Sequence, residues 1–372
     1  KIRVVGDYDI DGVCASYILV TGLHRIGAQV DCDIPDRIKD GYGINAQIIE
    51  KAAADGIALI ITCDNGIAAF EAMEYAHQMG IDVIITDHHE VFKEEGKDRL
   101  PLAKAIINPK QADCTYPFDG ICGAVVAWKL VELFYRFFDV SYEEWKLLLS
   151  VAAIATVGDV MQLKDENRII VRYGLRALEK TKNLGLRALL QVCELENKEL
   201  TVYHIGFIIG PCLNASGRLK TAKLALELLM SKDMETAKQR AMELKRLNDE
   251  RKDMTQQGVD QAIEIVEAAL EEKVLVVYLS DCHESLAGII AGRLRERYQR
   301  PAIVLTDAQE EGMLKGSGRS IGAYPMFEKL CEADGFLEKY GGHPMAAGLS
   351  LKKENVEAFR RFLNEHSKLV ES

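Results

Sequence analysis

Three carboxylates alternate with other residues directly after the first apolar run of the chain, and this stretch constrains the fold more than any other. The run Ile2–Val5 has the composition of a buried strand, and residues 13–26 have the apolar spacing of a helix. Between them stand Asp7, Asp9 and Asp11. Side chains two residues apart on a strand point the same way, so a strand that continued through this stretch would project the three carboxylates together.

Like charges this close cannot all remain ionised unless a positive charge lies among them. A divalent metal ion held by hard oxygen ligands would supply that charge. The simpler alternative is an acidic turn in contact with solvent. The motif by itself does not decide between the two interpretations.

Short apolar runs alternate with helical patterns through the first part of the chain. The apolar runs are 2–5, 29–34, 58–62, 82–86 and 104–107, and the helical patterns are 13–26, 45–54 and 68–79. This rhythm is typical of βαβ units and predicts a parallel sheet with helices on both faces. In such sheets ligands bind beyond the carboxyl ends of the strands.

Polar residues follow two further strands of this predicted sheet. One apolar run ends at Asp64, and the next ends at Asp87, His88 and His89. Three strands therefore deliver carboxylates and imidazoles to one edge. Aspartate and histidine ligands without cysteine suit Mn²⁺, with Mg²⁺, Zn²⁺ and Fe²⁺ as alternatives. We expect one histidine to bind the metal while Asp87 orients its other ring nitrogen.

Several other stretches have both a functional and a plain interpretation. Asp159 follows a mostly apolar helix, 145–156, and a glycine, where a C-terminal turn is the simpler interpretation. Four stretches combine glycines with cations or other polar residues: the loop 35–43, the turn-rich stretch 210–218, and the polar turns 315–320 and 341–348. Glycine lets a backbone approach a ligand closely, and arginine and serine can donate to a phosphate. Taken singly, each is an ordinary turn.

The rest of the chain predicts a second domain. From about residue 124 the pattern becomes helical, and a long polar helical region, 221–272, could bridge two domains as one or two helices. A βαβ-like pattern follows, with strands at 274–279 and 302–306 around a helix at 286–297. The length of 372 residues also favours two domains.

Composition and missing motifs exclude several classes of function. The formal net charge of −11 argues against coating nucleic acid by bulk charge, although a local basic groove stays compatible with it. No apolar run is long enough to cross a membrane, and no signal peptide is visible. The nine dispersed cysteines are typical of a reduced cytosolic protein. The chain lacks a Walker P-loop and a Rossmann fingerprint, which disfavours nucleotide hydrolysis by that route and dinucleotide redox chemistry.

Taken together, the motifs resemble those of one family. The stretches 6–12, 64–66, 87–89 and 158–159 are similar, in order, to the four motifs of the DHH phosphoesterases, and 341–343 resembles the glycine-rich signature of the associated DHHA1 domain. The form of the first motif, the loop 37–43 and the stretch 214–218 resemble the RecJ branch of single-strand-specific exonucleases. The resemblance covers essentially the whole chain.

The resemblance implies an α/β fold. A parallel-sheet DHH catalytic domain at 1–218 would be joined by a long helical linker at 219–272 to a smaller α/β DHHA1 substrate-binding domain at 273–372, with the active-site cleft between them. It also implies a hydrolase of ester bonds: a metal-dependent 5′→3′ exonuclease that degrades single-stranded DNA to 5′-mononucleotides by a two-metal mechanism, in DNA repair and recombination.

The resemblance also implies roles for individual residues. The metal ligands for two Mn²⁺ or Mg²⁺ ions would be Asp9, Asp11, Asp64, His88 and Asp159, with Asp64 and Asp159 bridging the ions. His89 would contact the scissile phosphate or act as general acid, with Asp87 and Asp7 as the other catalytic residues. The phosphate at the 5′ end would be bound by Arg37, Arg218, Ser317 and Arg319, with Gly342 and His343 near the first nucleotides.

Other interpretations remain open at this point. A DHH phosphoesterase could instead act on short oligoribonucleotides, phosphorylated adenosine nucleotides or cyclic dinucleotides. A family inorganic pyrophosphatase is disfavoured, because Val5 stands where that branch has a histidine. A non-catalytic nucleic-acid-binding or scaffold relative would bind Mn²⁺ weakly or not at all.

The expected partners are single-stranded DNA with a 5′ end and a single-strand-binding protein or helicase, in the cytoplasm and away from membranes. RecJ-type proteins usually carry an oligonucleotide-binding domain after this core. Since the sequence starts at Lys1 and stops soon after the DHHA1 motif, we expect it to be part of a longer protein.

Overall fold

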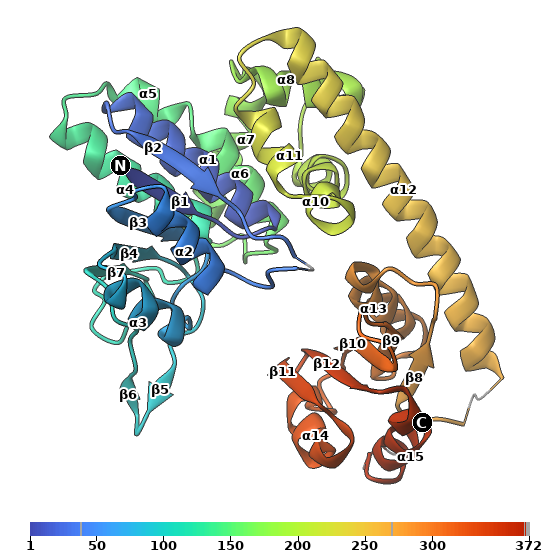
Figure 1. The fold of residues 1–372 in the computed structure, drawn as a ribbon. Helices are drawn as coiled ribbons and strands as arrows, with labels where there is room; N and C mark the ends of the chain where they lie inside the picture. Colours follow the sequence, from blue (N-terminus) through green and yellow to red (C-terminus); the bar gives the residue numbers. More distant parts are fainter. Residues whose placement is uncertain (38, 269–270, 368, 370–372) are drawn as a thin grey trace. The chain divides into compact units, whose positions relative to one another are not determined.

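The computed structural model divides into two compact units, Lys1–Asn248 and Asp249–Ser372. It describes residues 1–37, 39–268, 271–367 and 369. The division between the units falls inside the predicted linker, 219–272, and the domain boundaries given above stay predictions. Figure 1 shows a sheet flanked by helices in each unit.

The first unit is built on a five-stranded sheet in the order β2-β1-β3-β4-β7. Its strands are β1 Ile2–Val5, β2 Val30–Asp33, β3 Leu59–Cys63, β4 Asp82–Thr86 and β7 Ala105–Ile107. All four pairings are parallel, and the register places Val5 of β1 beside Asp33 of β2 and Thr62 of β3. The predicted parallel sheet is confirmed.

Helices cover both faces of this sheet because its strand residues point alternately to either side. Val4 belongs to a core shared with α1, Ile10–Arg25, and α4, Gly123–Phe137, whereas Val5 belongs to a core shared with α2 and α3. The helices α2 and α3 span Ala46–Ala54 and Phe70–Gln78. Both valines are fully buried. The alternation of the sequence therefore becomes a three-layer arrangement.

The strand order creates a switch point between β1 and β3. The chain leaves β1 towards β2 on one side and then crosses to β3 on the other. Doubly wound folds bind ligands beyond the carboxyl ends of the strands at such a switch point. The acidic residues that follow Val5 and Cys63 come after the carboxyl ends of β1 and β3, the two strands at this point.

Helices and a small hairpin complete the first unit. They are β5 Lys93–Glu94, β6 Lys97–Asp98, α5 Tyr142–Lys146, α6 Leu149–Gly158, α7 Asp165–Glu179, α8 Leu184–Val192, α9 Val202–His204, a π-helical turn Ile205–Ile209, α10 Gly210–Leu219 and α11 Lys223–Leu229. The helix α12, Met234–Glu267, continues into the second unit. The helix predicted at 145–156 is thus divided between α5 and α6.

The stretch 210–218 forms the helix α10, not the predicted turn. Pro211 stands in the first turn of this helix, where its missing N–H costs nothing. Gly217 allows a close approach, since a Cβ atom there would lie 2.3 Å from the carbonyl oxygen of Tyr8. The glycines that suggest a turn in the sequence therefore serve helix packing against the first motif.

The second unit contains a mixed five-stranded sheet in the order β11-β12-β10-β9-β8. The strands are β8 Leu275–Tyr278, β9 Ala302–Asp307, β10 Met313–Arg319, β11 Lys339–His343 and β12 Ala346–Lys352. Only β8 and β9 pair in parallel among these strands. The stretch 315–320 was predicted as a turn but lies mainly in β10, where pairing on both sides overrides the local preference of its glycines.

Helices also cover both faces of the second sheet. The end of α12 and α13, Ala287–Tyr298, share one core with β8 and β9, while α14, Met326–Glu332, and α15, Val356–Glu365, share the other. Short 3₁₀ turns lie at Glu284–Leu286, Asp334–Phe336 and Lys353–Asn355.

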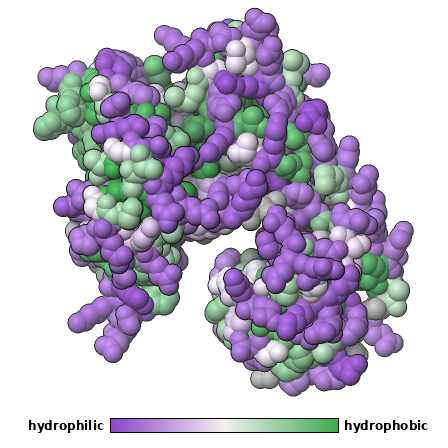
Figure 2. All heavy atoms as spheres, in the orientation of Figure 1, coloured by the Kyte–Doolittle hydropathy of each residue, from purple (hydrophilic) through white to green (hydrophobic). Residues whose placement is uncertain are grey.

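Among the described residues, no helix combines the length and the apolar composition that a membrane span requires. In Figure 2, hydrophilic side chains prevail on the visible face, with smaller hydrophobic areas between them.

The buried side chain of Asn65 joins the ends of β1 and β3. Its Nδ2 donates to the carbonyl oxygens of Val5 and Cys63 at 3.1 and 2.9 Å, and its Oδ1 accepts from the backbone of Ile44 at 3.1 Å. We predict that Asn65→Ala lowers the free energy of unfolding by about 1–3 kcal/mol, because buried polar groups lose their partners.

Urea unfolding followed by tryptophan fluorescence measures this change, since both tryptophans, Trp128 and Trp145, lie in the first unit. The control is Gln78→Ala, which removes an exposed amide at the end of α3. An Asn65→Ala variant as stable as the control would contradict the prediction.

Candidate metal centre

The first motif folds as a tight entry into α1. The strand β1 ends at Val5, and Asp9 caps α1, with its Oδ1 accepting from the backbone of Asp11 and Gly12 at 2.9 and 3.0 Å. The strand therefore does not continue through Asp11, and the three carboxylates do not project from one strand face. An aspartate that satisfies free N–H groups at a helix start is more stable than a continued strand edge here.

Asp11 is turned towards the start of α4. Its two carboxylate oxygens accept from the backbone of Gly123 and Ala124 at 2.6 and 2.8 Å. The positive end of a helix dipole favours a negative charge at this place. The side chain of Asp11 is fully buried, and the N–H groups at the start of α4 hold its carboxylate in place.

Asp64 takes an unusual backbone conformation at the end of β3. Its φ is 61°, in the left-handed region that costs non-glycine residues about 1–3 kcal/mol and is concentrated at functional sites. The hydroxyl of Tyr42 donates to its carbonyl oxygen at 2.8 Å, and its N–H donates to Thr86 at 3.0 Å. Gly123 is needed beside it, because a Cβ there would lie 2.8 Å from the Cβ of Asp64.

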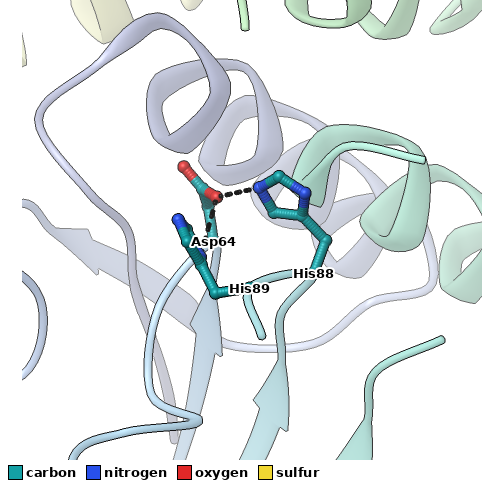
Figure 3. A group of neighbouring side chains, drawn as sticks. All are labelled: Asp64, His88 and His89. Carbon is teal, nitrogen blue, oxygen red and sulfur yellow. Dashed lines mark ion pairs between the residues drawn. The ribbon is translucent and has the colours of Figure 1, made fainter. Parts of the chain in front are cut away.

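The ring of His88 lies at the meeting point of three carboxylates. Its Nε2 is 3.1 Å from Asp64 Oδ1, 3.5 Å from Asp11 Oδ2 and 3.6 Å from Asp159 Oδ2. Asp159 comes from the end of α6, where it follows Gly158. Figure 3 shows Asp64 between His88 and His89. The ends of β3, β4, α6 and the start of α1 therefore converge on one place.

Among the residues that the structure describes, three overlapping groups of side chains could hold a metal ion, with the ligand atoms of each group within 4.8 Å of one another. They are Asp64–His88–His89, Asp11–His88–Asp159 and Asp7–Asp9–Asp64. All five predicted ligands fall within these groups. Asp64 belongs to two of them, as a bridging carboxylate would, whereas Asp159 belongs to one, so its bridging role stays a prediction.

The electrostatics of the centre fit a divalent cation. Burial, reinforced by neighbouring carboxylates, raises the pKa of Asp64 well above its usual range and that of Asp159 to about 8. Burial lowers the pKa of His88, which keeps its imidazole neutral and able to bind a metal. In the described part of the chain, Asp7 Oδ1 and Asp64 Oδ1 are buried without a hydrogen-bond donor. A cation would satisfy both oxygens.

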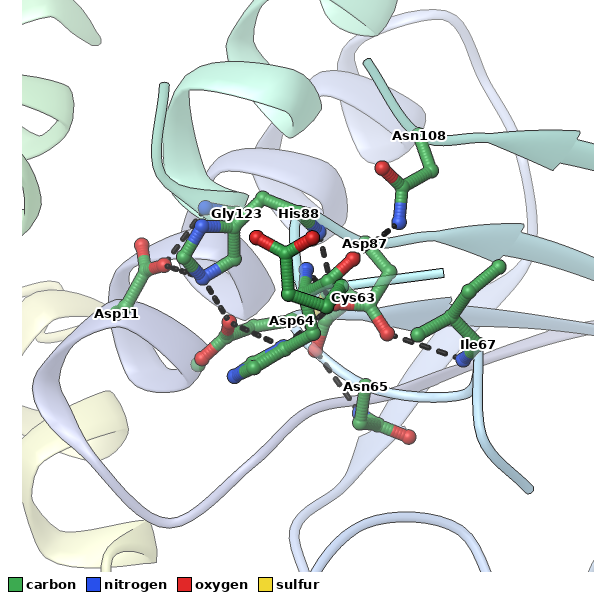
Figure 4. A network of polar contacts seen from close by, with 12 residues as sticks. Asp11, Cys63, Asp64, Asn65, Ile67, Asp87, His88, Asn108 and Gly123 are labelled. Atoms are coloured by element: carbon green, nitrogen blue, oxygen red, sulfur yellow. Dashed lines mark hydrogen bonds and ion pairs between the residues drawn. The ribbon is translucent and has the colours of Figure 1, made fainter. Parts of the chain in front are cut away.

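Asp87 holds the ring of His89, not that of His88. Its Oδ1 lies 2.7 Å from His89 Nδ1, and its Oδ2 accepts from Ile67 N at 3.0 Å (Figure 4). The Nδ1 of His88 has no hydrogen-bond partner among the described residues. The expectation that Asp87 orients the metal-binding histidine therefore does not apply to His88, whose ring points towards the other carboxylates.

The pair of Asp87 and His89 favours a charged imidazolium. Burial alone would lower the pKa of His89, but the hydrogen bond and the charge of Asp87 outweigh it, and the pKa is raised. For Asp87, burial is likewise outweighed by the contact with His89, and its pKa is lowered. The side chain of His89 is half exposed, so a ligand can reach the proton it carries.

Two contacts of His89 were not predicted from the sequence. The hydroxyl of Tyr42 is 3.3 Å from His89 Nδ1, and Asn108 Nδ2 donates to the carbonyl oxygen of His89 at 2.9 Å. Asn108 directly follows β7, so the rule that identified Asp64 and Asp87 at strand ends would also have found it. Tyr42 lies inside the loop 37–43, where the spacing of residues does not indicate which way a side chain points.

The first unit carries two of the predicted phosphate-binding arginines, Arg37 and Arg218. The guanidinium of Arg37 stands 4.6 Å from the centre of the Tyr8 ring. Arg218 is in the last turn of α10. Burial raises the pKa of Tyr8, and the positive charges of both arginines act against this rise.

The four remaining predicted residues lie in the second unit. On β10, Arg319 Nη1 donates to Ser317 Oγ at 2.9 Å. The start of α13 lies against both side chains, since a Cβ on Gly288 would be 2.7 Å from Arg319 and 2.9 Å from Ser317. Gly342 and His343 stand exposed on β11, and Gly342 has a φ of 146° that suits glycine alone.

Comparison with known proteins identifies two family domains. Residues 1–157 match the DHH family, N-terminal domain, and residues 271–368 match the DHHA1 domain. The chain is 43% identical, over 98% of its length, to a Bacillus subtilis protein called single-stranded-DNA-specific exonuclease RecJ, and 36% identical over 98% to the Escherichia coli protein of the same name. It spans 45% and 66% of the lengths of these relatives.

The fold also matches a solved structure. A crystal structure described as exonuclease RecJ bound to manganese superposes with a TM-score of 0.86 at 29% identity. The match covers 99% of this chain and 90% of that one. The predicted α/β architecture is thereby confirmed, and the metal named there is the one that the ligand types favour here.

Addition of Mn²⁺ should stabilise the first unit. At a concentration about 100 times the dissociation constant, a ligand that binds only the folded state adds about 2.7 kcal/mol. We predict that Mn²⁺ raises the melting temperature of the unmodified chain and has little effect on Asp64→Asn. Asparagine tolerates the left-handed backbone, so this variant removes a charge without changing the fold.

Differential scanning calorimetry with and without Mn²⁺ measures both shifts. The matched control is Asp113→Asn, which removes an exposed carboxylate outside the three groups. An equal shift in Asp64→Asn and in the control would exclude this centre as the binding site.

Without metal, the centre should make stability fall as pH rises. The pKa of Asp159 is raised to about 8 and that of Asp7 to about 7, mainly by burial and next by nearby carboxylates. In the unfolded chain both titrate near 4. The folded state therefore binds more protons than the unfolded state across this range, and the free energy of unfolding should increase from about pH 8 to about pH 6.5.

Urea unfolding in the presence of a chelator at these two pH values tests the sign of this pH dependence of stability. Asp159→Asn should reduce the dependence, and saturating Mn²⁺ should abolish it by satisfying the carboxylates. A metal-free chain that loses stability as the pH is lowered over this range would contradict the account.

Proposed function

Because this chain belongs to the DHH family, we propose that it is a metal-dependent exonuclease that hydrolyses single-stranded DNA from the 5′ end and releases 5′-mononucleotides. The observation that carries the proposal is the position of His88 Nε2 within 3.1–3.6 Å of three carboxylates from three different parts of the fold. The relatives named RecJ exonucleases give it further support.

The metal ligands in this proposal are the five predicted ones: Asp9, Asp11, Asp64, His88 and Asp159. Asp7 lies in or beside this set. When bound, two divalent ions supply positive charge beside the phosphoryl oxygens and activate water for attack on phosphorus. The protein contributes a buried, rigid arrangement of ligands, because backbone N–H groups and tight glycine contacts fix Asp9, Asp11 and Asp64.

His89 contacts the scissile phosphate in this proposal, with Asp87 as its orienting partner. A raised pKa keeps the imidazole charged near neutral pH, so it can pair with a phosphoryl oxygen or donate a proton to the leaving 3′ oxygen. The 2.7 Å contact with Asp87 holds the ring, and Tyr42 lies against its edge. General acids of this kind typically contribute about 10²–10⁴-fold to rate.

The 5′-terminal phosphate is assigned to the cationic residues. Arg37 lies over the ring of Tyr8 and Arg218 is in the last turn of α10 in the first unit, and Arg319 lies beside Ser317 on β10, against the start of α13, in the second. Arginine forks and helix N-termini both suit phosphate. Gly342 and His343 are assigned to the first nucleotides.

The wider biological role follows from the same assignment. Single-stranded DNA with a 5′ end is the substrate, in DNA repair and recombination, and the enzyme acts in the cytoplasm. A single-strand-binding protein or a helicase would present such ends to it.

Incubation with Mn²⁺ and a single-stranded oligonucleotide carrying a 5′-phosphate and a 3′ label tests the function. We predict progressive shortening from the 5′ end. Asp64→Asn should lower the rate by more than about 100-fold, since even residues that only orient metal ligands contribute up to about that factor.

Other substrates, tested in parallel, distinguish the exonuclease from the alternative activities. Blunt duplex DNA should resist, whereas cleavage confined to short oligoribonucleotides or cyclic dinucleotides would assign the chain to the small-substrate branch of the family. Binding of Mn²⁺ without hydrolysis of any of these substrates would refute the exonuclease assignment for this chain.

A further inference from the structure

Asp33 is a buried carboxylate held by two lysines at the end of β2. Its Oδ1 accepts from Lys223 Nζ and its Oδ2 from Lys51 Nζ, each at 2.8 Å. Its side chain is only 9% exposed, while both lysines are about half exposed. Burial alone would raise the pKa of Asp33, but the two lysines outweigh it and the pKa is lowered, so the carboxylate stays charged.

The ion pair with Lys223 joins two segments that each carry an arginine. Asp33 ends β2, and the chain continues directly into the loop that contains Arg37. Lys223 begins α11, directly after the segment that carries Arg218 at the end of α10. Asp33 and Lys223 are 190 residues apart in the sequence.

A second contact fixes the same two segments from the other side. The guanidinium of Arg37 lies over the ring of Tyr8, and Gly217 brings the end of α10 within van der Waals contact of the Tyr8 carbonyl. Tyr8 thus contacts both segments. The segments that carry the two arginines are therefore held together at two points, once through Tyr8 and once through Asp33.

We propose that Asp33 and Lys223 form a clamp that positions Arg37 and Arg218 to bind the 5′-terminal phosphate of the strand. This inference rests on the function proposed above. Two guanidinium groups repel each other and have flexible side chains, so holding their backbones before the ligand arrives reduces the cost of binding. Asp33 and Lys223 are positioning residues, since neither touches the phosphate.

Lys51 provides the matched control. It contacts the same carboxylate at the same distance, but it comes from α2 and makes no link to the segment of Arg218. Lys51→Met therefore removes one of the two charges on Asp33 and leaves the connection between the arginine segments in place. Lys223→Met removes the connection, and Lys223→Arg keeps a cation that can restore it.

The readout is the preference for a 5′-phosphate over a 5′-hydroxyl. Equilibrium binding of two otherwise identical 3′-labelled oligonucleotides is measured in a chelator, where nothing is cut, and kcat/KM is measured with Mn²⁺. The preference is the ratio of the value for the 5′-phosphate oligonucleotide to the value for the 5′-hydroxyl oligonucleotide. Every contribution that the two oligonucleotides share cancels in this ratio. We expect Lys223→Met to lower the ratio about three- to fivefold, the size expected for removal of a half-exposed ion pair. Lys51→Met and Lys223→Arg should retain it.

Each other outcome overturns a specific claim. If the unmodified chain prefers the 5′-phosphate and Lys223→Met keeps that preference, the clamp is wrong and the exonuclease function stands. Equal loss in Lys51→Met would show that Asp33 needs its charge balance and not the link. If the unmodified chain binds both strands equally, the phosphate role of the arginines fails together with the clamp. A binding preference without hydrolysis refutes the function and leaves the clamp supported.

Discussion

The metal centre depends on the cost of placing several carboxylates in one buried space. Asp11 and Asp64 are almost fully buried, and with Asp159 they converge on the neutral ring of His88. Without a cation, mutual repulsion and lost hydration work against this arrangement, as the raised pKa of Asp64 indicates. The remainder of the fold must therefore hold these groups in place against their own repulsion.

Backbone structure, and not basic side chains, supplies most of that restraint. The start of α1 binds Asp9, the start of α4 binds Asp11, and the amide of Asn65 fixes the strand end beside Asp64. Because N–H groups carry only partial charges, they orient the carboxylates without neutralising them. The negative charge is thus retained for a metal ion. Lysine or arginine in the same positions would compete with that ion.

Sequence predicted the centre well wherever a ligand follows an apolar run. Asp64 and His88 are found at strand ends because parallel strands present their carboxyl ends to one edge. The prediction failed where a glycine is compatible both with a turn and with close packing of a helix. Gly217 suggests a turn in isolation but allows α10 to approach Tyr8, and this contact becomes visible only in three dimensions. For the same reason, spacing alone could not reveal the pairing of Asp87 with His89 or of Asp33 with Lys223.

The wide separation of the ligands along the chain has a consequence for biosynthesis. A nascent chain that has emerged only as far as β7 already contains Asp64 and His88, but it lacks the α4 backbone that binds Asp11, and it lacks Asp159. Among the described residues, the group Asp11–His88–Asp159 is therefore completed only when α6 has been made, whereas the other two groups lie earlier in the chain. On the ribosome, a chain that ends before α6 therefore lacks part of the ligand set of the candidate metal centre.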